Sequence, residues 1–238
     1  MKADRMFYTA AGALFLLMMA VGFHSFAHGQ GQGGRVIDPS IFSLVALHGM
    51  AIAAWYVLFF VQSLLIAVRK RKLHMTLGWA AIAIGLTIAV TGSLVAIRSV
   101  QVTPPQFVFF GLLYSRFLLV MLVEIALYTS FVAVGLVVRK QPKKHRAMML
   151  LASLSLLAGA TARMSFLDPV FGHAGWVGLF GAVFLLGAVL LLVRFAMTRS
   201  FEPWFAGGYA VWVIAFIAAE NLALTQAWSR MAIVILKL

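Results

Sequence analysis

The chain alternates between long apolar runs and short polar segments. An α-helix needs roughly 20 apolar residues to cross the hydrocarbon core of a bilayer, and seven runs reach about that length. We place them at residues 7–23, 41–68, 76–97, 107–138, 147–166, 174–195 and 205–228. The pattern predicts an all-α fold in which residues 1–238 form one transmembrane domain, a polytopic bundle of seven helices.

The composition strengthens this prediction. Apolar residues make up 63% of the chain and charged residues 11%, whereas a soluble domain is about half apolar and a quarter charged. The apolar surplus has to face lipid, so we expect a multi-pass protein of the bacterial inner (plasma) membrane. The chain has no cysteine, which excludes disulfides, thiolate metal sites, thiol redox chemistry and the attachment of c-type haem.

The cations predict the orientation in the membrane. Thirteen of the 19 Lys and Arg residues precede the first run or lie in and beside the loops after the second, fourth and sixth runs. The positive-inside rule then makes the N-terminus and these loops cytoplasmic and puts the C-terminus outside. The net charge of +13 reflects this topology and attraction to anionic lipid headgroups. The expected partners are the lipid bilayer and other membrane subunits, and not nucleic acid.

Three residues within the second apolar run form a stripe along one side of the predicted helix. His48, Trp55 and Gln62 are seven residues apart, and seven helical steps return to within about 20° of the starting direction, so the three share one face. A Gln amide that faced lipid would lack a hydrogen-bond partner. The stripe therefore predicts either a seam of hydrogen bonds to other helices or a face that lines a ligand.

Ionisable residues inside membrane spans are costly and mark function by default. Glu124 lies in the middle of the fourth run and Glu220 in the outer half of the last, so both are candidates for a proton relay or a buried acid. We expect four side chains at similar depth in the outer leaflet: His48, Arg116, Arg163 and Glu220. They form either a shared pocket for an anionic or carbonyl head group, such as a quinone or a haem propionate, or separate groups that pair between helices or reach to the interface.

Two histidines lie at matching depth on the cytoplasmic side. His74 and His145 each begin a predicted helix beside a basic loop, and the segments "VRKRKLHM" and "VRKQPKKHRAMM" that contain them echo each other. The echo indicates either a duplicated helical hairpin or two ordinary basic loops. A b-type haem held by two histidines needs both imidazoles at one depth on facing helices, so this pair is a candidate haem site. The alternative is that both rings contact lipid headgroups.

A second pair of histidines lies at the outer end of the first run. His24 and His28 are four residues apart, which places two side chains on one helix face and suits a metal pair. Nearby methionines favour copper as the metal. The alternative is a polar loop at the water interface.

Several of these residues belong to a pattern found in other proteins. The pattern comprises "HG" at 48–49, Trp55, Gln62, "LHMTLG" at 73–78, "KHRAMM" at 144–149 and Arg163. Over residues 40–165 or so it resembles a set of uncharacterised bacterial inner-membrane proteins with a His-Gly…Trp…Gln…Leu-His…Leu-Gly motif. More remotely, the chain resembles the membrane b-type cytochromes of the ferric-reductase kind. That resemblance implies two pairs of haem-ligating histidines in a four-helix core, carried here by His48, His74 and His145, with His24 as the fourth.

We hypothesise a redox or cofactor-binding membrane protein that holds b-type haem or quinone. Its candidate cofactor-binding residues are His48, Trp55, Gln62, His74, Arg116, His145 and Arg163. The alternatives are an accessory subunit of a larger membrane complex and a proton-coupled small-molecule transporter. The sequence has no phosphate-binding glycine loop, no HExxH and no GxSxG, which are motifs of several large enzyme classes. Whether the protein is an enzyme stays open.

Overall fold

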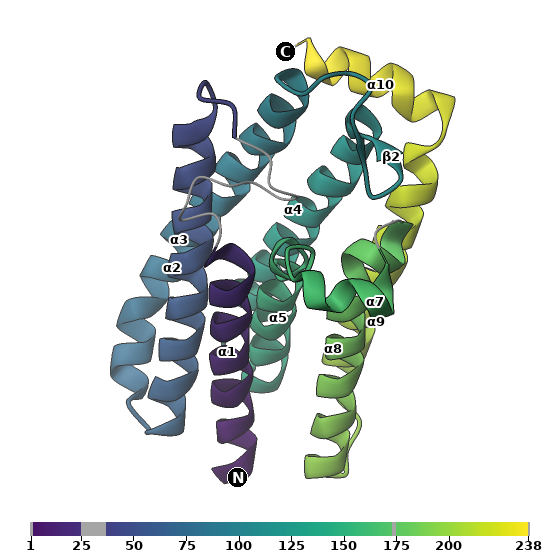
Figure 1. Ribbon diagram of the computed structural model, residues 1–238. Coiled ribbons are helices and arrows are strands. Elements are labelled where there is room, and N and C mark those ends of the chain that lie inside the picture. The colour runs from purple at the N-terminus through teal and green to yellow at the C-terminus, as the bar shows by residue number, and fades with distance from the viewer. Residues whose placement is uncertain (1, 25–36, 173–174, 238) are drawn as a thin grey trace.

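The computed structural model describes residues 2–24, 37–172 and 175–237, and this part of the chain is almost entirely helical (Figure 1). Its six long helices are α1 Lys2–Phe23, α2 Phe42–Ala67, α3 Arg71–Gln101, α4 Tyr114–Val137, α8 Gly175–Thr198 and α9 Pro203–Ala223. The shorter elements are β1 Val108–Phe109, β2 Leu112–Leu113, α5 Pro142–Ser155, α6 Ala158–Thr161, η3 Ser165–Leu167, α7 Asp168–Phe171 and α10 Gln226–Leu236.

Within the described residues, the six long helices are each apolar and long enough to cross a membrane. The fifth predicted span is broken instead of straight. It consists of α5–α6 and η3–α7, which qualify as a span only as a pair and are bent by 90° at the break. The break includes Met164, whose backbone angles (φ −92°, ψ 87°) leave the helical region. The predicted all-helical architecture is confirmed for the described residues, and the long apolar helices support a multi-pass membrane protein with six candidate spans, or seven if the bent pair counts as one.

Helices α2 to α5 form a ring of four. α2 packs on α3, α3 on α4, α4 on α5, and α5 back on α2, so α3 and α5 lie diagonally across the ring. Fully buried side chains fill it from every helix: Tyr56, Ile88, Leu118, Tyr128 and Leu150. Around the ring, α1 packs on α2, α9 packs on α4 and α5, and α8 packs on α6 and α9, as Figure 1 shows.

The fourth predicted span begins later than expected. Residues 108–113, which we assigned to its first turns, form a hairpin in which Val108 pairs with Leu113 and Phe109 with Leu112. The turn between the strands has positive φ angles at Phe110 (48°) and Gly111 (83°). An α-helix cannot include that left-handed backbone, so α4 starts at Tyr114.

The last predicted span ends earlier than expected, at Ala223, and a separate helix follows it. α10 lies across one end of the bundle, at the top of Figure 1, opposite the end that holds the α2–α3 and α8–α9 loops. The Thr225 hydroxyl caps it by accepting a hydrogen bond from the Trp228 backbone N–H (3.2 Å). Trp228 and Ala232 are buried, whereas Met231 and Val234 are exposed, so α10 turns one side to the bundle and another outward.

Candidate functional site

The imidazole rings of His74 and His145 meet at the end of the ring that holds the α2–α3 and α4–α5 loops. Their centroids are 6.4 Å apart and their planes are inclined by 85°. Both side chains are partly buried. The sequence predicted two histidines at one depth, and the structure places them on the diagonal helices α3 and α5 with their rings close together.

A backbone carbonyl lies behind each ring. His74 Nδ1 is 3.3 Å from the Gln62 carbonyl oxygen, and His145 Nδ1 is 2.8 Å from the Gly135 carbonyl oxygen. A carbonyl can only accept, so these contacts are hydrogen bonds when Nδ1 carries the proton, and the lone pair is then on Nε2. Histidines that ligate metals use this arrangement, because the hydrogen bond fixes the ring and raises the basicity of the free nitrogen.

The local sequence explains why the two sites are alike. The His74 N–H bonds to the Lys70 carbonyl (3.1 Å), and the His145 N–H bonds to the Gln141 carbonyl (3.0 Å). Each histidine therefore lies in the first turn of its helix, directly after a tight basic loop. Side chains in a helix tilt toward its N-terminus, so each ring reaches back to the last turns of the preceding helix. The echo between the two segments thus corresponds to two hairpins with equivalent histidine contacts.

The pair suits some metal groups better than others. With a metal–nitrogen bond of about 2.0 Å, two imidazoles on opposite sides of one metal have centroids roughly 6 Å apart, close to the 6.4 Å found here. Among the described residues no group of three or more His, Cys, Asp or Glu is placed to hold a metal ion. A bare zinc or copper ion needs three or four protein ligands. A haem supplies four nitrogens of its own and needs only two axial histidines.

The stripe on α2 faces into the bundle. The His48 ring bonds to the Thr91 hydroxyl on α3 (2.9 Å), and the Trp55 indole N–H donates to the Ser153 hydroxyl on α5 (3.1 Å). The Gln62 amide oxygen is shielded from solvent and has no hydrogen-bond partner in the described part of the chain. These contacts match the hydrogen-bond seam at two of the three positions, while the ligand reading of the stripe stays a prediction.

Glu124 interacts with a cation from the broken span. Arg163 lies between α6 and η3, where it donates to the Gly159 carbonyl, and its guanidinium is 4.5 Å from the centroid of the Phe23 ring. The charges of Arg163 and Glu124 act on each other, and Glu124 also interacts with Tyr56. The central acid predicted from the sequence therefore has a cation near it inside the bundle.

Of the four side chains predicted for an outer pocket, His48, Arg163 and Glu220 have different neighbours. His48 faces α3, Arg163 faces α1 and α4, and the Glu220 carboxylate accepts a hydrogen bond from the Trp176 backbone at the start of α8. The structure shows no hydrogen bond or ion pair between any two of His48, Arg116, Arg163 and Glu220, all of which are described. No contact therefore supports one shared pocket, and the pocket stays a prediction.

The proposed copper pair falls partly outside the described residues. His24 Nδ1 is 3.0 Å from the Val21 carbonyl within its own chain segment, and His28 lies in the part of the chain that the structure does not describe. The copper site stays a prediction.

A buried ion pair was missed by the sequence reasoning. Arg194 is only 1% exposed and pairs with Glu202, which the Arg146 guanidinium also approaches at 3.9 Å. Cation–π contacts join Arg194 to the rings of Phe7 (5.0 Å) and Tyr8 (5.3 Å). We had counted both arginines only as topological cations. The sequence did contain a signal for this ion pair. Glu202 is the one acid in the α8–α9 loop, and a buried arginine such as Arg194 needs a carboxylate as its partner.

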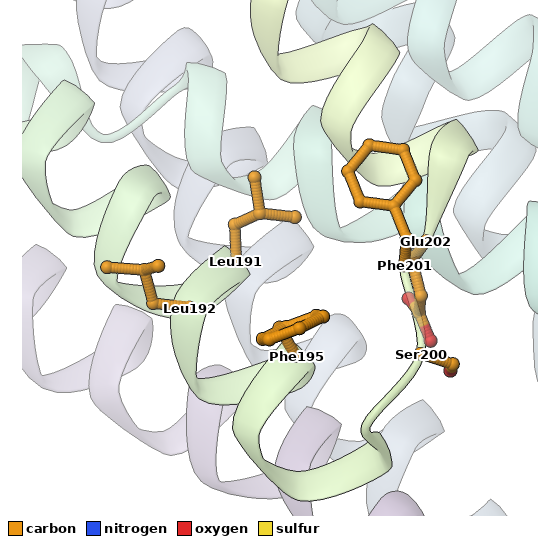
Figure 2. A pocket seen from close by; sticks show the side chains of 6 residues that line it. All are labelled: Leu191, Leu192, Phe195, Ser200, Phe201 and Glu202. Atoms are coloured by element: carbon orange, nitrogen blue, oxygen red, sulfur yellow. The ribbon is translucent and has the colours of Figure 1, made fainter.

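One cavity lies close to this ion pair, and Figure 2 shows its lining. Its volume is about 140 Å³ and its walls are Leu191, Leu192, Phe195, Ser200, Phe201 and Glu202. These residues come from α8 and the loop after it. None of them is a candidate from the sequence analysis, and the walls are mostly apolar. We therefore assign the cavity no chemistry and keep the histidine pair as the candidate site.

Comparison of the chain with protein-family models, with curated proteins and with solved structures gave no match.

Proposed function

We propose that the protein binds one b-type haem between His74 and His145 and transfers electrons in the membrane. The observation that carries this proposal is the closeness of two imidazoles (6.4 Å between centroids), each with its Nδ1 against a backbone carbonyl. Facing helices of a four-helix core are a common place for haem and other cofactors.

The residues around the pair suit this role. The Gln62 and Gly135 carbonyls orient the rings before any cofactor binds, which reduces the ordering cost of ligation. When bound, the haem iron would supply one-electron chemistry. Exposed cations in the first turns of α3 and α5 would pair with haem propionates: Arg71, Lys72 and Lys143.

Haem fits this pair better than the other ligands considered. A bare metal ion would lack a third protein ligand among the described residues, and a quinone needs no matched pair of free imidazole nitrogens. The accessory-subunit and transporter hypotheses stay predictions. They are compatible with a membrane bundle, but no contact described above favours either one.

An absorption spectrum tests the proposal. Protein made in cells supplied with haem precursor and purified in detergent is expected to show a Soret band, sharp α and β bands on reduction, and iron at one atom per chain. His74→Ala and His145→Ala should each remove these bands or convert them to a five-coordinate form.

The matched control is His48→Ala. This histidine lies on the same ring of helices but bonds to Thr91, so its loss should leave the spectrum unchanged. Wild-type protein without haem, or bands that survive in both the His74 and the His145 variants, would refute the proposal. Bands lost only in the His48 variant would move the site to the outer half.

A further inference from the structure

Two buried polar atoms in the interior of the ring have no protein partner. The Tyr128 side chain is 0% exposed, yet its hydroxyl makes no hydrogen bond to any described residue, and neither does the shielded amide oxygen of Gln62. Buried polar atoms are normally satisfied by protein groups or by internal water. Two such atoms in one bundle therefore indicate a place for water.

A glycine of α3 lies beside the Tyr128 hydroxyl. Gly85 faces the hydroxyl there, and a Cβ atom on this glycine would be 3.5 Å from the Tyr128 oxygen. A larger residue at position 85 would fill this side of the hydroxyl. On the other side the Tyr128 ring is in edge contact with Trp55 (5.2 Å between centroids), and Gln62 follows Trp55 two turns along the same face of α2.

The two atoms lie between ionisable groups at different depths. Glu124 precedes Tyr128 by four residues on α4, so their side chains are neighbours on one helix face, about 5–6 Å apart at Cβ. At the other end, the Gln62 backbone accepts the hydrogen bond from His74. From the middle of the bundle toward the cytoplasmic loops, the order is therefore Glu124, Tyr128, Gln62 and then the histidine pair.

The charges around Glu124 allow a proton to arrive and leave. Arg163 acts on it from the broken span and Tyr56 from α2, while Tyr128 is the ionisable neighbour on its own helix. A carboxylate near a single guanidinium in a low-dielectric interior can exist in either protonation state. The Tyr128 hydroxyl both donates and accepts, and the Gln62 amide oxygen accepts from water, so water held between them can pass the proton toward Glu124.

We propose that the ring contains a hydrated proton path from its cytoplasmic end past Gln62 and Tyr128 to Glu124, with water molecules bridging the two unpartnered atoms. The path carries protons to a carboxyl in the middle of the membrane and returns them to the same side. This goes beyond the haem proposal and does not require it, since the groups named here are in place whether or not the histidines hold a cofactor.

Infrared spectroscopy of the purified protein in lipid tests the path. The C=O stretching band of the Glu124 carboxyl is identified by its loss in Glu124→Gln. Its shift after transfer to D₂O then measures how fast the carboxyl proton exchanges. We expect exchange at least tenfold slower in Tyr128→Phe and in Gln62→Leu than in the wild type, because each variant removes one of the two bridged polar groups.

Tyr209→Phe is the matched control. The Tyr209 hydroxyl, on α9, donates to the Phe184 carbonyl (2.7 Å) and lies outside the path, so its loss should not change the exchange rate. Equal rates in all variants would overturn the proposal, and so would the absence of any protonated Glu124 band between acid and alkaline pH. If Tyr128→Phe fails to fold, Gln62→Leu alone decides between these outcomes, and the haem spectrum is not needed for either.

Discussion

At the scale of single residues, a buried guanidinium holds several helices together. Arg194 is 1% exposed and pairs with Glu202, while the Arg146 guanidinium approaches the same carboxylate from α5 at 3.9 Å. Two cations thus share one acid, and the aromatic rings of Phe7 and Tyr8 face the guanidinium of Arg194. The cluster joins α1, α5, α8 and the start of α9.

Removal of the acid is therefore expected to be costly. Glu202→Gln removes a carboxylate that pairs with a buried arginine, and we expect a loss of about 3 kcal/mol in the free energy of unfolding. Thermal unfolding in detergent measures it. A second change, Arg194→Met, made together with Glu202→Gln should recover part of the loss, because it removes the buried charge that interacted with the carboxylate.

Glu220→Gln is the control for this prediction. Its side-chain oxygen accepts from the Trp176 backbone, and an amide oxygen can still do so, so we expect a change below about 1 kcal/mol. Similar unfolding temperatures for the two single variants would show that the Arg194 cluster does not contribute to stability.

At the scale of elements, close backbone approach decides how the helices fit. Gly22 in the last turn of α1 lies against α6, and a Cβ atom there would be 2.4 Å from the Ala160 carbonyl oxygen. In α9, by contrast, a Cβ at Gly207 would meet nothing within 4 Å. Without a hydrophobic driving force between helices in lipid, small residues that permit such approach are a main source of helix association.

The two glycines predict opposite effects of the same substitution. Gly22→Ala should force α1 away from α6 and lower stability by about 1–3 kcal/mol. Gly207→Ala should be neutral or stabilising by up to about 1 kcal/mol, since alanine favours the helix and meets no neighbour. Unfolding temperatures in one detergent compare them directly, and a Gly22→Ala protein as stable as the wild type would contradict the close α1–α6 contact.

The elements also show where sequence reasoning stops. Hydropathy located every long helix, because the length and apolarity of a membrane span are written directly in the residues. It could not find the hairpin at 108–113, which is as apolar as the helix it precedes and differs by the left-handed backbone at Phe110 and Gly111. Nor could it separate α10 from α9, since both are apolar and the break depends on the Thr225 cap.

The candidate site was predictable only in part, for a related reason. The depth of His74 and His145 follows from their place after basic loops, and that prediction led to the pair. The closeness of their rings depends on the order in which four helices close into a ring, which no local pattern contains. The same limit explains the outer residues: His48 and Glu220 share a depth in the sequence but face different helices.

At the scale of the whole molecule, the broken span decides which side the C-terminus lies on. The chain enters α5 beside the basic loop and bends by 90° after α6. The Gly175 N–H at the start of α8 then bonds to the Phe110 carbonyl (2.8 Å) in the hairpin that precedes α4. Since α4 runs from that hairpin toward the basic α4–α5 loop, the bent pair brings the chain from one face to the opposite one. We therefore expect the bent pair to cross the membrane and α10 to lie on the outer face.

Cysteine labelling tests this topology without background, because the chain has no cysteine of its own. Lys140, in the α4–α5 loop, and Arg230, on α10, are both exposed. In intact cells a membrane-impermeant maleimide should label Arg230→Cys and not Lys140→Cys, which should react only after the membrane is opened. Three crossings separate the two positions if the bent pair spans the membrane, and two if it returns to the face it came from. Labelling of both cysteines from one side would therefore show a re-entrant segment, whereas the exchanged pattern would keep the crossing and reverse the orientation that the basic loops predict.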